Sequence, residues 1–457
     1  MEGNIDFKDK KILVVGLGRS GAAALKALLS AGADVEVQDS KKAGELDEEL
    51  EAFLKEKGVR SYLGEKPEDP AGYDFIVPSP GVPLKLDFIA KAIKAGVPVI
   101  GELELAYEMG GGKYVAITGT NGKTTTTTLV GEIFKEAGRD TRVVGNIGVA
   151  VMNEALNADD DTWMITEVSS FQLETISRFK PVVSAILNIT PDHLDRHGSM
   201  ENYALTKARI FENQDESGYV VMNFDDKESF RLATGAKATI VPFSREEKLL
   251  FGAFVKNDKI VIRNHDEETI EFCGVHELKI PGTHNLENAL AATAIAYFAG
   301  IEPQYISKAL REFSGVEHRI EYCGTVNGVR YVNDSKGTNT DAAIKAINAI
   351  DGDIVLIAGG YDKGADFTEF IKAFGSKVKH VALMGAMASK IKIAAEKLGY
   401  THTIIMKDME DCVAEAARLA KKGDTVLLSP ACASWDMYDD FEKRGEHFKK
   451  CVERLGK

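Results

Sequence analysis

The chain repeats one pattern along its length: a short apolar run, a polar or glycine-rich turn, and a segment with helical spacing of apolar residues. The run at 12–15 is followed by a helical pattern at 22–29 and by a second strand pattern at 35–39. Apolar runs at 114–117 and 354–358 are also followed by glycine-rich turns and helical patterns. Strands that alternate with helices favour parallel sheets covered by helices, so the pattern predicts an α/β fold.

The patterns divide the chain into three α/β units, because 457 residues are too many for one hydrophobic core. The first unit covers residues 1–101. The second, 102–314, contains a stretch of alternating residues at 252–280 that predicts a small β insertion. The third, 315–457, opens with a hairpin signal around Asn327-Gly328.

A phosphate-binding loop is predicted after the apolar run that ends at Ile117. The turn Thr118-Gly119-Thr120-Asn121-Gly122 leads into a helical pattern that begins at Lys123. Backbone N–H groups at a helix N-terminus attract anions, glycines allow close approach, Lys123 adds a positive charge, and the Thr124 hydroxyl can bind Mg²⁺. The match is to G-x-x-G-K-T, because Ile117 stands where the longer G-x-x-x-x-G-K-[ST] motif has its first glycine. We interpret the turn as an ATP loop.

A second glycine motif lies in the first unit. Gly16-Leu17-Gly18-Arg19-Ser20-Gly21 is a complete G-x-G-x-x-G fingerprint between two strand patterns, and Asp39 ends the second strand. Alone, this arrangement predicts a Rossmann domain that binds a dinucleotide, as in NAD-dependent oxidoreductases. That hypothesis leaves the ATP loop unexplained.

Polar residues follow three apolar strands of the second unit. Asn146, Glu167 and His193 each come after such a strand, and the carboxyl ends of parallel strands meet at one edge of a sheet. Glu167 and His193 are therefore the best metal candidates beside the ATP loop. Lys207 lies in a helical pattern with Arg209, and the pattern by itself predicts a solvent-exposed lysine.

Composition excludes several classes of protein. The net charge of −14 argues against binding to nucleic acid or an anionic membrane. The five cysteines are scattered and form no C-x-x-C pair, which indicates a reducing compartment and neither a disulfide nor a zinc framework. No signal peptide and no apolar run of about 18 residues is visible, so we expect a cytoplasmic protein.

Taken together, the motifs resemble those of the Mur ligase family. The residues that carry the resemblance are Gly119 to Thr124, Glu167-Val168-Ser169-Ser170, Asn188 to Asp195, Asn333-Asp334-Ser335-Lys336, Lys363 to Phe367, Leu428 to Ser434, and Phe441. They occur in the expected order and span nearly the whole chain.

The resemblance implies three domains: an N-terminal Rossmann-like domain that holds the UDP end of a substrate, a central P-loop ATPase-like domain, and a C-terminal Rossmann-like domain. It implies a monomeric, ATP-dependent amide ligase that joins D-glutamate to UDP-N-acetylmuramoyl-L-alanine through an acyl phosphate. Such an enzyme makes peptidoglycan precursors for the cell wall. It also implies two Mg²⁺ ions and a carbamylated Lys207, which reverses the view of that lysine from its helical pattern.

The resemblance assigns site residues position by position. The UDP-substrate positions are Gly18, Arg19, Ser20, Asp39, Ser40, Ser79, Gly81, Asn146 and Ser169. The ATP positions are Gly119, Thr120, Asn121, Gly122, Lys123, Thr124, Thr125, Asn285, Arg319 and Asp334. The D-glutamate positions are Lys336, Thr338, Lys363, Ser434 and Phe441. The catalytic positions are Lys123, Glu167, His193 and Lys207, and the metal positions are Thr124, Glu167, His193 and Lys207.

Other ligases of this superfamily remain as alternatives. A folylpolyglutamate synthetase would lack the full domain before the ATP loop, and other Mur ligases would lack the signals at 363–367 and 429–434. A non-catalytic ATP-binding module would leave Glu167, His193 and Lys207 without a role.

Overall fold

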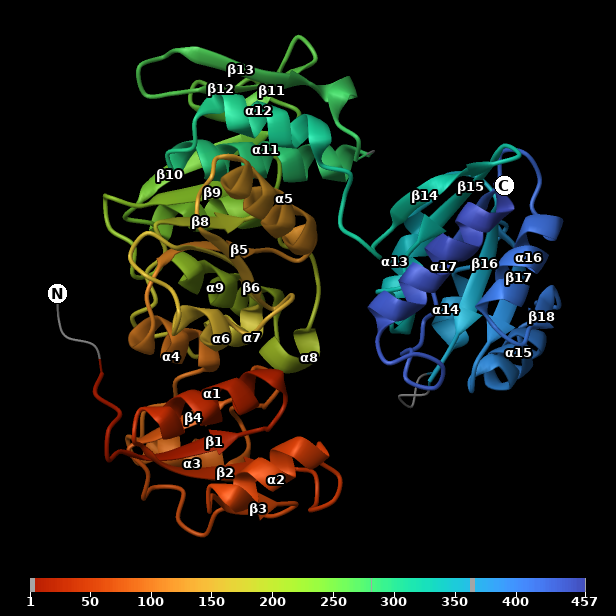
Figure 1. Ribbon diagram of the computed structural model, residues 1–457. Helices are drawn as coiled ribbons and strands as arrows, with labels where there is room; N and C mark the ends of the chain where they lie inside the picture. Colours follow the sequence, from red (N-terminus) through yellow and green to blue (C-terminus); the bar gives the residue numbers. More distant parts are fainter. Residues whose placement is uncertain (1–4, 281, 362–365, 457) are drawn as a thin grey trace. The chain divides into compact units, whose positions relative to one another are not determined.

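The computed structural model describes residues 5–280, 282–361 and 366–456. The chain forms two compact units, Met1–Phe313 and Ser314–Lys457, and each is built from parallel or mixed sheets with helices (Figure 1). The α/β class predicted from the sequence is confirmed. No helix in the described ranges is both long and apolar enough to cross a membrane.

The first sheet has four parallel strands in the order β3-β2-β1-β4. Its strands are β1 (Lys11–Val15), β2 (Asp34–Asp39), β3 (Arg60–Leu63) and β4 (Phe75–Pro78). The accompanying helices are α1 (Arg19–Ser30), α2 (Glu48–Glu56), α3 (Asp87–Lys94) and α4 (Glu102–Met109). After α3, a single parallel bridge joins Val99 to Ile76. The strand order reverses between β1 and β4, and ligands of open α/β sheets bind at such a point.

The second sheet has nine strands in the order β13-β12-β11-β10-β9-β8-β5-β7-β6. They are β5 (Lys113–Thr118), β6 (Thr141–Gly145), β7 (Trp163–Glu167), β8 (Val183–Ile186), β9 (Tyr219–Asn223), β10 (Thr239–Ser244), β11 (Gly252–Lys256), β12 (Lys259–Arg263) and β13 (Thr269–Gly274). The predicted β insertion is present, but it extends this sheet because β11 pairs with the edge of β10. Since β5 lies between β7 and β8, the segments that follow these three strands meet at one edge.

Helices cover this nine-stranded sheet. They are α5 (Lys123–Glu136), α6 (Val151–Ala155), α7 (Ser170–Leu173), α8 (Leu194–His197), α9 (Met200–Ala208), α10 (Lys227–Phe230), α11 (Thr283–Phe298) and α12 (Pro303–Glu312). Short 3₁₀ helices lie at η1 (Arg209–Phe211), η2 (Arg231–Gly235) and η3 (Val275–Glu277). The alanine-rich α11 is a core helix, with residues 288–296 all buried.

The second compact unit contains a six-stranded sheet in the order β14-β15-β19-β16-β17-β18. Its strands are β14 (Glu321–Val326), β15 (Val329–Asn333), β16 (Ile354–Gly359), β17 (Val378–Met384), β18 (Thr403–Ile405) and β19 (Thr425–Leu428). Its helices are α13 (Thr340–Ala349), α14 (Thr368–Lys372), α15 (Ala388–Lys397), α16 (Met409–Leu419) and α17 (Phe441–Leu455). Separate apolar clusters join α13, α14 and α15 to one face and α16 and α17 to the other.

The predicted hairpin is present at the start of this unit. β14 and β15 pair antiparallel around Asn327 and Gly328, whose φ angles are 53° and 79°. Two successive left-handed residues are what a tight two-residue turn requires. The short strand β18 was not expected, because its sequence carries little of the strand pattern.

Candidate active site

The predicted ATP loop joins β5 to α5 in a closely wrapped conformation. Gly119 and Gly122 have φ angles of 154° and 82°, which side chains with a Cβ rarely adopt. Lys123 Nζ folds back and donates to the carbonyl oxygens of Gly119 and Thr120, both at 2.8 Å. The lysine charge therefore lies on the loop next to the first N–H groups of α5, as phosphate binding requires.

Asn288 of α11 completes the floor of this loop. A Cβ added at Gly122 would lie 2.2 Å from Asn288 Oδ1, and Thr126 Oγ1 donates to the same oxygen at 3.2 Å. Asn288 Nδ2 donates to Asn285 Oδ1 at 3.2 Å. Sequence reasoning selected Asn285 and missed Asn288. The signal was the spacing of two asparagines by three residues, which places both on one face of a helix.

Glu167 lies at the end of β7, directly beside β5. Its side chain is buried, and its Oε1 accepts a hydrogen bond from Asn146 Nδ2 at 2.7 Å. Its Oε2 is buried and has no hydrogen-bond partner in the described part of the chain. A buried carboxylate oxygen without a partner is costly, and a hard cation would satisfy it. The donor set of Glu167 and the loop hydroxyl of Thr124 therefore fits Mg²⁺.

Lys207 is buried, so the exposed position predicted from its helical pattern is wrong. Only 1% of it is accessible, because the face of α9 that carries Tyr203, Ala204 and Lys207 packs inward. Lys207 Nζ donates to Gly119 O at 2.9 Å and to Thr118 Oγ1 at 3.3 Å. Burial, and then the nearby charge of Lys123, hold the pKa of Lys207 well below its ordinary value.

His193 is exposed and precedes α8 with a φ of 50°. Its ring lies 4.8 Å from that of Phe171, and its Nε2 is 3.7 Å from Asp192 Oδ2. The loop before it is tied to the ATP loop, since Thr120 Oγ1 donates to Thr190 O at 3.1 Å. The structure thus gathers Glu167, Lys207 and the His193 segment around the ATP loop. Their catalytic and metal-binding roles stay predictions.

The first glycine loop is closed by Asp39. Asp39 Oδ2 accepts from Leu17 N at 2.6 Å, and Oδ1 accepts from Lys41 N at 2.9 Å. Ser79 Oγ donates to Gly16 O at 2.7 Å, which joins the loops after β1 and β4 at the point where the strand order reverses. In an NAD site the acidic residue binds the ribose and the loop amides face the pyrophosphate. Here the Asp39 carboxylate accepts a hydrogen bond from the loop N–H of Leu17. This contact disfavours the binding of NAD in that way.

The remaining UDP-substrate candidates lie at the same edge of the first sheet. Ser20 is half-buried in the first turn of α1, and Ser40 is exposed directly after β2. Gly18 and Gly81 have no neighbouring atom within 4 Å of an added Cβ. These candidates therefore lie on or next to the loops that follow β1, β2 and β4.

Two arginines connect loops of the first sheet to segments of the central domain. Arg19 Nη1 donates to Gly148 O at 2.6 Å, in the segment that also contains Asn146. Arg196 Nη2 donates to Val82 O at 3.0 Å and to Glu174 Oε2 at 2.6 Å. Ser169 caps α7 nearby through its side chain. These contacts fix loops of residues 1–101 to segments of the central domain.

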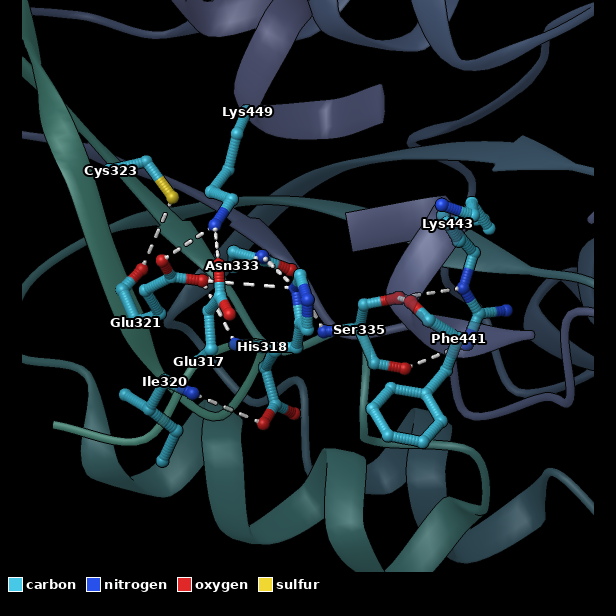
Figure 2. A network of polar contacts seen from close by, with 12 residues as sticks. Glu317, His318, Ile320, Glu321, Cys323, Asn333, Ser335, Phe441, Lys443 and Lys449 are labelled. Atoms are coloured by element: carbon cyan, nitrogen blue, oxygen red, sulfur yellow. Dashed lines mark hydrogen bonds and ion pairs between the residues drawn. The ribbon is translucent and has the colours of Figure 1, made fainter. Parts of the chain in front are cut away.

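The candidate residues of the second compact unit centre on Asp334. It is buried, and burial raises the pKa of its carboxyl to about 7 although Ser429 Oγ donates to it at 2.7 Å. Figure 2 shows the segment on either side of it: Asn333 contacts His318 and Glu321, and Ser335 Oγ donates to the Phe441 carbonyl at 2.8 Å. The segment after β15 is therefore fixed from both sides.

Arg444 joins the two loops that carry the D-glutamate candidates. Its side chain is buried and donates to Ser335 O at 2.8 Å, Cys432 O at 3.1 Å and Ala433 O at 3.2 Å. Burial lowers the pKa of Arg444 to about 10, so it remains charged at neutral pH. Sequence reasoning missed this residue, because its helix pattern resembles that of a solvated charged face.

The other candidates of this unit lie on the same loops. Lys336 Nζ is 5.9 Å from the centre of the Phe441 ring, Thr338 is half-buried, and Ser434 is buried. Arg319 is exposed and precedes Ile320, whose N–H donates to Asp334 Oδ1 at 3.3 Å. Lys363 lies outside the described residues.

Family models match most of the chain. The Mur ligase MurD-like N-terminal domain matches residues 10–101, the Mur ligase middle domain matches 117–296, and the Mur ligase glutamate ligase domain matches 318–432. The chain belongs to the Mur ligase family. The family predicted from the motifs is thereby confirmed.

Relatives in this family align along nearly the whole chain. The UDP-N-acetylmuramoylalanine–D-glutamate ligase of Caldanaerobacter subterraneus subsp. tengcongensis is 49% identical over 451 residues, covering 98% of this chain and 99% of that protein. The ligase of the same name from Thermoanaerobacter sp. strain X514 is 50% identical over 455 residues, covering 99% and 100%.

Solved Mur ligase structures share the fold. The UDP-N-acetylmuramate–alanine ligase of Thermotoga maritima has a TM-score of 0.53 at 21% identity and covers 97% of this chain and 99% of its own. A MurF ligase of Thermotoga maritima in complex with ADP has a TM-score of 0.51 at 18% identity and covers 98% and 96%. Together with the family matches, they confirm the predicted three-domain α/β fold.

Gly122→Ala tests the ATP loop. The new Cβ would meet Asn288 at 2.2 Å and would be strained at a φ of 82°, so the loop must change shape. We expect ATP affinity, measured by calorimetry, to fall by at least about 10-fold, or about 1.4 kcal/mol. Gly138→Ala is the matched control, because Gly138 follows the other end of α5 with a φ of 69° and open space around it. Equal ATP affinity in the two variants would contradict the assignment.

Proposed function

We propose that this chain is an ATP-dependent ligase that adds D-glutamate to UDP-N-acetylmuramoyl-L-alanine in peptidoglycan precursor synthesis. Two relatives that are 49% and 50% identical to this chain over nearly its full length are named as UDP-N-acetylmuramoylalanine–D-glutamate ligases. The structural observation that supports it best is the Oε2 of buried Glu167 beside a phosphate loop, an oxygen for which the described residues offer no hydrogen-bond partner. An oxidoreductase has no use for that arrangement, whereas phosphoryl transfer to a carboxylate does.

The proposal divides the work among three segments. Residues 1–101 hold the UDP end of the acceptor substrate at Gly18, Arg19, Ser20, Asp39, Ser40, Ser79 and Gly81, and Asn146 and Ser169 hold its further part. Residues 102–314 bind ATP through the loop 119–125 and Asn285, and Arg319 and Asp334 are the residues of 315–457 that contact ATP. Lys336, Thr338, Lys363, Ser434 and Phe441 bind D-glutamate.

The first chemical step joins two anions. The alanine carboxylate attacks the γ-phosphorus of ATP, the bond to the β–γ bridging oxygen breaks, and ADP leaves. Lys123 and the N–H groups of α5 stabilise the negative charge on the transferred group. Glu167 and Thr124 would hold Mg²⁺, which would further neutralise the negative charge on the transferred group.

The second step forms the amide. The amine of D-glutamate attacks the acyl phosphate carbon, and the tetrahedral intermediate expels phosphate and a proton. Lys336 supplies positive charge for the glutamate carboxylates, and Arg444 holds its loop in place. Positioning of the reacting groups can contribute roughly 7–11 kcal/mol in favourable cases. The site must also exclude water, because water would hydrolyse the acyl phosphate.

We further propose that Lys207 is carbamylated and binds a second Mg²⁺ together with His193. The neutral amine adds to the carbon of CO₂, an N–C bond forms, and a proton is released to solvent. Burial and the charge of Lys123 favour the neutral amine that this reaction requires. The carbamate anion would then balance the positive charge of Lys123 and of the metal ions.

The proposed enzyme acts as a monomer in the cytoplasm, without nucleic-acid or membrane partners. The net charge of −14 disfavours polyanionic surfaces. Among alternatives, other Mur ligases differ in the acceptor and in the amino acid that they add, so the choice of amino acid on a fixed acceptor is the property to test.

Phosphate release with a panel of amino acids tests the proposed function. With ATP, Mg²⁺ and UDP-N-acetylmuramoyl-L-alanine, we expect release to require D-glutamate, because the pocket must match both its chirality and its side-chain length. L-glutamate and D-aspartate are the matched controls and should give only background. Release that another amino acid supports equally well would contradict the proposed substrate.

The carbamate can be detected by NMR. In ¹³C-labelled bicarbonate we expect a carbamate resonance that is absent in Lys207→Ala. The resonance should persist in Lys227→Ala, because Lys227 is exposed at the start of α10. A spectrum without the resonance, or one in which it survives Lys207→Ala, would overturn this assignment.

A further inference from the structure

A second group of metal-ligating side chains lies between α16 and α17, apart from the candidate active site. Glu410, His447 and Cys451 each offer one ligand atom, and these atoms all lie within 4.8 Å of one another. The family motifs include none of the three residues, and the reactions proposed above do not use them. No C-x-x-C spacing marks the group, so the sequence did not reveal it.

The two helices place these side chains together. His447 and Cys451 are four residues apart on α17 and therefore lie on the same face. Glu410 is in the first turn of α16, which packs against α17. Cys451 is 5% exposed, whereas the His447 and Glu410 side chains are 33% and 57% exposed. The thiol thus forms the floor of the group, and the imidazole and carboxylate form a rim open to solvent.

A hydrogen bond orients the imidazole. Tyr438 OH lies 2.9 Å from His447 Nδ1, which fixes the ring and leaves the other nitrogen for a ligand. His447 Nε2 faces Glu410 Oε1 at 3.7 Å. Histidines that bind metals generally have their second ring nitrogen held by such a partner. The group therefore has both the ligand atoms and the support that a metal site needs.

Nearby charges are compatible with a cation. Arg454 Nη1 contacts Glu410 Oε1 at 2.7 Å, but its side chain is 66% exposed, and exposed ion pairs contribute little stability. Glu410 also has a second carboxylate oxygen, and Asp408 adds negative charge near Cys451. A cation can therefore bind Glu410 together with Arg454, or displace Arg454 from it, without leaving a buried charge unpaired.

We propose that Glu410, His447 and Cys451 bind one Zn²⁺-type divalent cation, with water in the fourth position. Thiolate, imidazole and carboxylate together form a donor set typical of zinc, whereas Mg²⁺ prefers oxygen ligands alone. On binding, the S–H bond of Cys451 breaks, a sulfur–metal bond forms, and the proton passes to solvent. No electrons are transferred.

The proposed metal site lies on the helix that also supports the candidate D-glutamate residues. The same α17 begins at Phe441 and carries Arg444, whose guanidinium joins the loops that end at Ser335 and Ala433. A cation bound by His447 and Cys451 of α17 and by Glu410 of α16 would cross-link the two helices. We therefore expect bound metal to raise the temperature of thermal unfolding.

Cobalt substitution tests the site in the full chain. After treatment with a chelator, Co²⁺ alone should produce a thiolate-to-cobalt charge-transfer band with a stoichiometry of one per chain, and Zn²⁺ should remove it. Cys451→Ser and His447→Gln should abolish the band. His447 is part-exposed, so its variant is expected to fold, and circular dichroism checks this. Tyr438→Phe should weaken Co²⁺ binding by about 10–100-fold.

Two matched variants separate this site from other groups. Cys412→Ser removes a buried sulfur that lies on α16, and His402→Gln removes an exposed histidine of the same compact unit. Both should keep the band. Absence of the band in the wild-type chain would overturn the proposal, as would a band that persists in Cys451→Ser or disappears in Cys412→Ser.

Discussion

The buried carboxylate of Glu167 is the feature on which the candidate active site depends. Asn146 satisfies one of its oxygens, and the other has no partner in the described part of the chain. Two lysines, Lys123 and Lys207, donate to the carbonyl of Gly119 in the adjacent loop. A buried carboxylate, a buried amine and the half-buried charge of Lys123 thus lie next to a loop shaped for phosphate. Such a site is costly in the free chain and becomes balanced when an anionic nucleotide and a cation bind.

Strand order explains why these groups meet. The neighbours β6, β7, β5 and β8 are parallel, so the segments that carry Asn146, Glu167, the ATP loop and His193 all emerge at one edge. Arg19 and Arg196 join loops of residues 1–101 to the central domain through hydrogen bonds to the carbonyls of Gly148 and Val82. In the proposed function, residues 1–101 hold the substrate at its nucleotide end and its other end is presented to ATP.

The sequence predicted what local signals encode. Apolar runs, glycine turns and an Asn-Gly hairpin specify strands and their ends, and the motifs selected Glu167 and Asp334, both of which are buried. The pattern alone placed Lys207 in solvent, because local sequence does not tell which face of α9 packs inward. Asn288 and Arg444 were missed for a similar reason, since their contacts come from distant segments. The sequence did not show that the insertion at 252–280 extends the central sheet, because its pairing with β10 depends on the tertiary arrangement.

The Mg²⁺ dependence of ATP affinity in Glu167→Gln tests the central claim most directly. In the wild-type chain we expect Mg²⁺ to tighten ATP binding, and in Glu167→Gln we expect most of this effect to be lost. Glu102→Gln is the control, because Glu102 is also buried, its Oε2 also has no hydrogen-bond partner among the described residues, and its Oε1 accepts from Met152 N. It should keep the full effect. An undiminished Mg²⁺ effect in Glu167→Gln would contradict the account.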